Sequence, residues 1–194
     1  MSLIYRYKKT AVAGPKTGEL LAFAREHISP DISDIKTEYC FYVELKEVLS
    51  PEEVEVLRWL LTETFEPENF SSDSFLTHDS SLITRNCLIE VGPRMNFSTA
   101  WSTNAVSVCH ACGLSRVTRI ERSRRFRLET TSGIGKEQAE RFASSLHDRM
   151  TECIYPVQLV TFDTGIEPEP VFSVPLVFVS HGFCTSSSSL FSGP

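Results

Sequence analysis

Long hydrophobic runs, a signal peptide and an excess of basic residues are all missing from this 194-residue chain. Its apolar runs reach only about half a dozen residues, whereas a membrane-spanning helix needs ~20. The start, Met1 to Tyr7, lacks the basic, apolar and small-residue order of a signal peptide. Six cysteines at irregular spacing indicate reduced thiols rather than a disulfide framework. We therefore expect a cytoplasmic protein, and not a secreted, membrane-embedded or fibrous one.

Acidic residues outnumber basic ones by 25 to 19, and the formal net charge is −6. This balance disfavours general attraction to nucleic acid or to an anionic membrane surface, so neither is an expected partner. A chain of this length can bury roughly 70% of its unfolded surface, and it needs no metal or disulfide to hold a core.

The order strand–helix–strand–helix occurs twice along the chain. Strands are expected at 3–7, 35–45, 86–91 and 117–128, and helices at 17–28, 50–61, 102–112 and 136–150. Ser50 and Glu53 predict a capping box, Gly113 a left-handed helix end, and Met150 a place on the apolar face of its helix. Corresponding elements start 82 to 86 residues apart. The pattern predicts an α+β, two-layer sandwich in which two βαβα units, about 1–65 and 82–152, share one four-stranded sheet. This domain is expected to span 1–155, followed by a Pro- and Ser-rich linker and tail at 156–194.

Two short motifs have a chemical and a structural interpretation. Cys109 and Cys112 have CxxC spacing, but no second pair completes a zinc site, and both fall on the apolar face of the predicted helix. We expect both thiols to be buried and slow to react, with redox or metal chemistry as the alternative. The segment Gly133–Lys136 resembles the end of a phosphate-binding loop, but a turn before a helix explains it better.

Arginines are concentrated in the strand expected at 117–128. Alternation places Arg119, Arg125 and Arg127 on one face, and Arg122 and Arg124 on the other. The residues Arg119, Arg124, Arg125 and Arg127 are candidates for an interface or for intramolecular ion pairs. Nucleic acid or a small phosphorylated ligand are the alternatives.

The segment from Gly92 to Asn104 is rich in hydrogen-bonding side chains. It either forms a surface loop with a helix cap at Ser102 or Thr103, or a recognition surface. The candidate docking residues are Arg94, Asn96, Ser98, Thr99, Trp101, Ser102, Thr103 and Asn104. If Arg94 and Trp101 serve docking, their replacement by alanine should leave the fold intact.

Several segments carry a family resemblance. Cys87–Thr99, Ser102–Cys109, Arg119–Leu128 and Leu146–Glu152 resemble, in order, the N-terminal region of the large eukaryotic type of phosphoribosylformylglycinamidine synthase. The resemblance covers roughly residues 35 to 160, and it implies a domain like two fused copies of the small PurS-type subunit.

The resemblance also implies a role. The complete enzyme makes formylglycinamidine ribonucleotide from formylglycinamide ribonucleotide, ATP and glutamine in purine biosynthesis. Its ATP and magnesium site and its glutaminase site lie in later domains. For this chain we expect no catalytic residue, no metal and no cofactor, and an accessory role that bridges the synthetase and glutaminase domains. The alternative is a divergent or truncated relative that acts as a non-catalytic protein-binding module.

Overall fold

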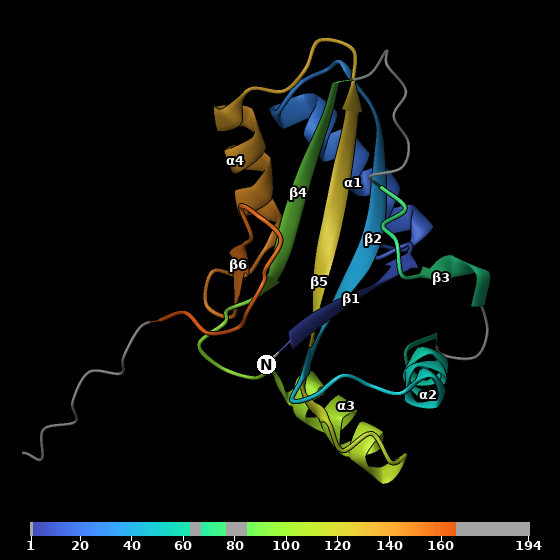
Figure 1. The fold of residues 1–194 in the computed structure, drawn as a ribbon. Helices are drawn as coiled ribbons and strands as arrows, with labels where there is room; N and C mark the ends of the chain where they lie inside the picture. Colours follow the sequence, from blue (N-terminus) through green and yellow to red (C-terminus); the bar gives the residue numbers. More distant parts are fainter. Residues whose placement is uncertain (1, 63–66, 77–84, 166–194) are drawn as a thin grey trace, which may run out of the picture. The chain divides into compact units, whose positions relative to one another are not determined.

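The helices and strands follow the order expected from the sequence, and the same order occurs in both halves of the chain (Figure 1). The computed structural model describes residues 2–62, 67–76 and 85–165. The first half comprises β1 (Ser2–Lys9), α1 (Gly14–His27), β2 (Ile32–Leu45) and α2 (Pro51–Thr62). The second half comprises β4 (Arg85–Pro93), α3 (Ala100–Ala111), β5 (Val117–Thr130) and α4 (Lys136–Leu146). Three short elements are η1 (Pro67–Asn69), β3 (Phe70–Ser71) and β6 (Glu152–Ile154).

One antiparallel sheet contains all six strands of the described residues, in the order β3–β1–β2–β5–β4–β6. The central pair, β2 and β5, runs from Ile32 opposite Thr130 to Leu45 opposite Val117. The predicted four strands are the four long ones, so the predicted total is wrong: β3 and β6 add an edge strand on each side. Strands of two or three residues are too short to show an alternating pattern in the sequence.

Two apolar clusters lie between the helices and one face of the sheet. The cluster under α2 and α3 contains Phe41, Val43, Leu45, Leu57, Leu61, Cys109 and Ile120. The cluster under α1 and α4 contains Ala24, Ile35, Ile89, Val91, Phe126, Leu128, Phe142 and Ala143. Ile120 and Phe126 are an even number of residues apart on β5, so both clusters lie on the same face. The fold is therefore α+β, with the helices in one layer and the sheet in the other.

Local signals define most helix ends. At α2, the Ser50 backbone N–H donates to Glu53 Oε2 over 2.7 Å, and the Glu53 N–H donates to Ser50 Oγ, which is the capping box expected from the sequence. Gly113, with φ of 87°, follows α3 in the left-handed conformation expected there. Gly135 is the N-cap of α4, so the structural interpretation of Gly133–Lys136 is confirmed.

Helix α4 is shorter than predicted. It ends at Leu146 because His147 adopts an extended conformation. The Asp148 carboxylate then accepts hydrogen bonds from the Met150 N–H and the Thr151 hydroxyl, which forms a turn. Met150, expected on the buried face of the helix, is instead 82% exposed.

The second face of the sheet has its own apolar cluster, which contains Tyr7, Cys40, Tyr42, Tyr155, Leu159 and Phe162. The segment after β6 supplies Leu159 and Phe162, and both side chains are buried. The expected boundary at residue 155 is therefore too early, and the compact unit continues to Thr164. The apolar stretch 171–178 and the serines at 186–189 lie outside the described residues.

None of the described helices combines the length and the apolar character that crossing a bilayer requires.

Candidate docking site

The loop that follows β4 begins at a tightly packed position. A Cβ on Gly92 would lie only 2.7 Å from the Tyr155 ring, so the ring packs directly on the backbone. The Tyr155 hydroxyl donates to the Pro93 carbonyl oxygen over 2.5 Å. Glycine is required here because the aromatic ring occupies the space of a side chain.

Arg94 is exposed, but its hydrogen bonds are made within the chain. Its Nε and Nη2 both donate to the Arg149 carbonyl oxygen, at 3.1 and 2.5 Å, and its backbone N–H donates to the Thr151 carbonyl oxygen. Arg94 therefore joins the loop to the turn that follows α4.

Glu121 and Arg119 hold the rest of the loop from the sheet. Glu121 is 1% exposed and accepts hydrogen bonds from the Thr99 backbone N–H (3.1 Å) and hydroxyl (2.8 Å). Arg119 pairs with Glu121 over 3.1 Å and donates to the carbonyl oxygens of Met95 and Phe97. The loop backbone is thus fixed by a buried ion pair.

Three of the predicted docking residues have structural roles. Thr99, rather than Ser102 or Thr103, is the N-cap of α3, and its hydroxyl accepts from the Ser102 N–H. Ser102 is buried and accepts from the Ile120 N–H. Trp101 is half-buried against the Phe41 ring, 6.1 Å between centroids. This packing predicts that Trp101→Ala destabilises the chain, in contrast to the expectation from the sequence.

The other predicted docking residues are exposed. They are Arg94, Asn96, Ser98, Thr103 and Asn104, and exposed Phe97 lies among them. Thr103 bonds back to the Thr99 carbonyl oxygen, so Asn96 and Ser98 are the predicted loop side chains available to a partner. The loop thus presents a short row of neutral hydrogen-bonding groups on a fixed backbone.

The candidate interface arginines make intramolecular contacts. Arg124 pairs with Glu152 over 2.7 Å and also donates to the Leu146 carbonyl oxygen. Arg127 is buried; it donates to the Leu76 carbonyl oxygen and pairs with Glu129. The alternation expected for β5 is confirmed, because Arg119, Arg125 and Arg127 share the face opposite the helices, but these groups serve the fold.

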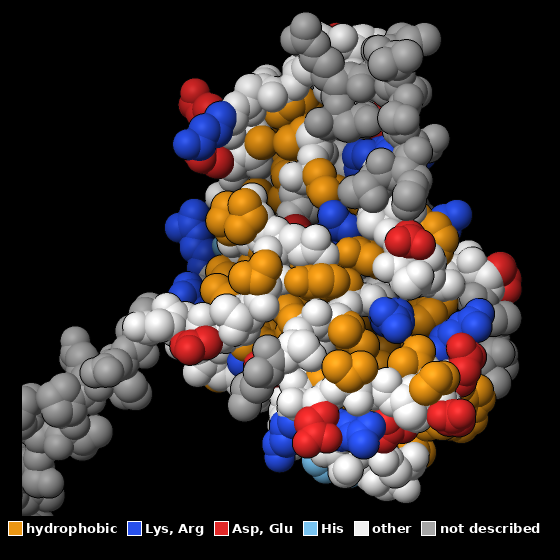
Figure 2. All heavy atoms as spheres, in the orientation of Figure 1, with side chains coloured by type: hydrophobic (Ala, Val, Ile, Leu, Met, Phe, Trp, Pro, Cys, Tyr) orange, Lys and Arg blue, Asp and Glu red, His pale blue; other side chains and the backbone are white. Residues whose placement is uncertain are grey.

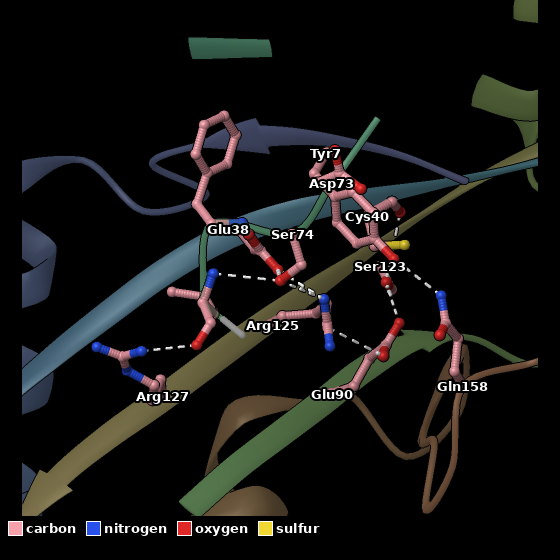
Figure 3. A network of polar contacts seen from close by, with 12 residues as sticks. Tyr7, Glu38, Cys40, Asp73, Ser74, Glu90, Ser123, Arg125, Arg127 and Gln158 are labelled. Carbon is pink, nitrogen blue, oxygen red and sulfur yellow. Dashed lines mark hydrogen bonds and ion pairs between the residues drawn. The ribbon is translucent and has the colours of Figure 1, made fainter. Parts of the chain in front are cut away.

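Arg125 lies between two buried carboxylates (Figure 3). Its Nη1 lies 2.6 Å from Glu38 Oε1, and its Nε lies 3.4 Å from Glu90 Oε2. Glu38 also accepts hydrogen bonds from the Ser74 hydroxyl and the Phe75 backbone N–H. Like Glu121, Glu38 thus ties a loop to the second face of the sheet.

Glu90 has a perturbed titration. Burial raises its pKa above the usual range, and hydrogen bonds from the Ser123 and Tyr42 hydroxyls, both at 2.5 Å, oppose that effect together with the Arg125 charge. Burial, with contributions from Cys40 and Glu90, also raises the pKa of Tyr42. The Tyr42 and Ser123 hydroxyls thus both donate to Glu90, and this network joins β2, β4 and β5 on the second face of the sheet.

The sequence pattern missed Glu38 and Glu90 as functional positions. A signal existed for Glu121, because an acid that alternates with Arg119, Ser123 and Arg125 in a buried strand needs a partner on the same face. For Glu90, which lies on another strand, only the sheet order shows the partner.

The two thiols of the CxxC motif differ in exposure. Cys109 is buried and Cys112 is exposed at the C-cap of α3, so the expectation that both thiols are buried is wrong for Cys112. Within residues 2–62, 67–76 and 85–165, no group of three His, Cys, Asp or Glu side chains could hold a metal ion. A cleft of about 550 Å³ beside α1 is lined by charges of both signs, including Lys16 and Glu19.

Comparison with known proteins identifies close sequence relatives. A family profile described as the N-terminal part of formylglycinamide ribonucleotide amidotransferase matches residues 38–159. A probable chloroplastic/mitochondrial phosphoribosylformylglycinamidine synthase of Arabidopsis thaliana is 44% identical over 175 residues, which cover 90% of this chain and 12% of the relative. Phosphoribosylformylglycinamidine synthases of Dictyostelium discoideum and Homo sapiens are 43% and 38% identical, over 91% and 73% of this chain and 13% and 10% of their own lengths.

The matched region thus spans about an eighth or less of each of these relatives. It includes the strand β4, the loop after it, the cap of α3 and the buried ion pair that holds them. The chain belongs to the phosphoribosylformylglycinamidine synthase family and carries its N-terminal domain.

Proposed function

We propose that this chain is the accessory domain that bridges the synthetase and glutaminase domains of phosphoribosylformylglycinamidine synthase. One observation carries the proposal: the loop at 94–98 is held rigidly from inside and still exposes Asn96, Phe97 and Ser98. A surface that is already ordered loses little conformational entropy on binding, which favours recognition.

The chemistry of the loop suits docking better than catalysis. The side chains of Asn96, Phe97 and Ser98 are exposed and neutral, and the exposed Arg94 guanidinium donates to the Arg149 carbonyl oxygen. The ionised neighbours Arg119 and Glu121 are paired with each other. We therefore propose that the chain contributes no catalytic residue, and that ATP and magnesium are bound by later domains of the enzyme. Because Arg124, Arg125 and Arg127 contact internal carboxylates, a nucleic acid partner is not proposed.

We also infer that the fold consists of two copies of one unit, as the resemblance to paired PurS-type subunits implies. The strand order is symmetric about the central pair β2–β5, so that β3, β1 and β2 on one side correspond to β6, β4 and β5 on the other. The strand pairings correspond as well. When 85 is added to the residue numbers of β1 and 83 to those of β2, the β1–β2 register gives the β4–β5 register: the pair Leu3 and Glu44 corresponds to the pair Leu88 and Arg127. Corresponding residues also lie on the same face of the sheet, because Ile4 and the corresponding Ile89 both pack under the helices, and this supports a duplication.

We propose the cytoplasm as the compartment, because the described cysteines are all free. The Arabidopsis relative is named as a chloroplastic/mitochondrial protein, which differs from the compartment proposed for this chain. Immunolocalisation of the complete protein in its own cells tests this proposal.

Glutamine- and ammonia-driven turnover of the full-length enzyme tests the bridging role. The double variant Asn96→Ala/Ser98→Ala should lower glutamine-dependent turnover by about tenfold, because loosened docking lets ammonia escape, and should change ammonia-driven turnover less than about twofold. The matched control is Ser115→Ala, an exposed serine on the turn after α3. Equal losses in both assays, or no loss in either, would contradict the bridging role.

A further inference from the structure

The two faces of the sheet are covered very differently. Helices α1 to α4 pack on one face. Over the described residues, the opposite face is covered mainly by two short segments, 72–76 and 155–162. Figure 1 shows the second of these segments, in orange, beside β6 and β4, while α1 lies behind the sheet.

The segment 155–162 has one side in the core and one side in solvent. Tyr155, Leu159 and Phe162 are buried, whereas Val157 and Val160 are 73% and 79% exposed. Its position is fixed, because the Tyr5 hydroxyl donates to the Leu159 carbonyl oxygen over 2.8 Å. The two valines are therefore exposed by a defined geometry.

Two further apolar side chains lie at the same end of the molecule. Phe97 is 37% exposed, and its carbonyl oxygen accepts from Arg119, whose guanidinium lies 4.2 Å from the centroid of the Phe162 ring. Met150 is 82% exposed on the turn that Arg94 joins to the loop. Figure 2 shows apolar side chains exposed over β6 and the segment after it.

We propose that Phe97, Met150, Val157 and Val160 form one docking surface, and that a later domain of the same polypeptide covers it. The proposal rests on the bridging role and adds the surface and its occupant. Large apolar side chains that are exposed together mark interaction sites, and these four are held by the fold at one end of the sheet.

The occupant follows from the relatives and from the path of the chain. In the relatives, the region matched by this chain is only 10–13% of the polypeptide, so most of each protein is available to cover the surface. The segment 155–162 forms part of the surface and leads into the chain beyond Thr164. Arg94 and Arg149 lie beside Met150, so the occupant should combine apolar side chains with acidic ones at its rim.

Cysteine labelling tests the proposal directly. Met150→Cys and Val160→Cys are made separately, both in the 194-residue chain and in the full-length enzyme, with Cys112→Ser in the background. Labelling should be at least tenfold slower in the full-length enzyme than in the chain at both positions. Val108→Cys on α3, 50% exposed on the helical side, is the control and should label equally in both proteins.

Each outcome decides the proposal. Equal labelling rates of Met150→Cys and Val160→Cys in the two proteins overturn it. Protection in the 194-residue chain that increases with protein concentration also overturns it, because the surface would then be covered by a second copy of the chain. Protection without any loss of glutamine-dependent turnover in Asn96→Ala/Ser98→Ala supports the surface and contradicts the bridging role. Loss of that turnover without protection supports the bridging role and contradicts the surface.

Discussion

Glu121 accepts two hydrogen bonds from Thr99, one from the backbone N–H and one from the hydroxyl, although the residues are 22 positions apart. The N-cap of α3 is therefore anchored to a buried carboxylate of β5. This contact joins the start of the helix, the preceding loop and the sheet into one rigid element.

Removing that anchor should destabilise the chain. Thr99→Val keeps the shape of the side chain but loses the cap and the bond to Glu121, which should lower the free energy of unfolding by about 1–2 kcal/mol. Glu121→Ala leaves Arg119 unpaired and should lower it by about 3 kcal/mol. Urea denaturation of the chain measures both, and a change below 0.5 kcal/mol for Glu121→Ala would contradict the anchor.

Gly92 should tolerate no side chain. Gly92→Ala places a methyl group against the Tyr155 ring and should lower the free energy of unfolding by about 1–3 kcal/mol. Gly18→Ala on α1 is the matched control: no atom lies within 4 Å of its Cβ, so it should stabilise the chain by about 0.5–1 kcal/mol. Thermal unfolding of the two variants should shift in opposite directions.

The two tryptophans should differ in their effect on stability. Trp101→Ala removes contacts with Phe41 and with the Arg122 guanidinium, 5.2 Å from the ring, and should lower the free energy of unfolding by about 2–3 kcal/mol. Trp59 on α2 is 62% exposed, and Trp59→Ala should change it by less than about 0.5 kcal/mol. Chemical denaturation followed by circular dichroism compares them; equal effects would contradict the packing role of Trp101.

The thiols of the CxxC motif should react at different rates. Cys112 is exposed and should be alkylated quickly in the folded chain. Cys109 is buried, and burial raises its pKa to about 11, so it should react only on unfolding. Peptide mapping after timed alkylation separates the two sites, with Cys112→Ser as the control; fast modification of Cys109 would reopen the redox interpretation.

Glu90 should make stability depend on pH. Burial raises its pKa in the folded state, so the folded chain holds this proton more tightly than the unfolded chain. Its contribution to stability is therefore present below the usual glutamate pKa and is lost as pH rises through the raised value. Glu90→Gln should thus gain stability relative to the unmodified chain as the pH rises from the usual glutamate pKa through the raised value, measured by urea denaturation over a series of pH values. A constant difference across that range would contradict the shift.

Much of the fold could be predicted from the sequence, because its signals are local. The capping box at Ser50 and the helix end at Gly113 depend only on neighbouring residues, and both are confirmed. The alternation in β5 and the order of the long elements follow for the same reason. The family match likewise resides in contiguous segments that sequence comparison can read.

The tertiary structure alone decided which polar residues serve the fold and which remain available. Trp101, Ser102 and Asn104 are close in sequence, yet the first packs on β2, the second bonds to β5 and the third is exposed. These roles depend on strands far away in the chain, and only the sheet register brings Glu38 and Glu90 to Arg125. A sequence specifies its local elements directly, but the partners of a buried charge are fixed only when distant strands pair.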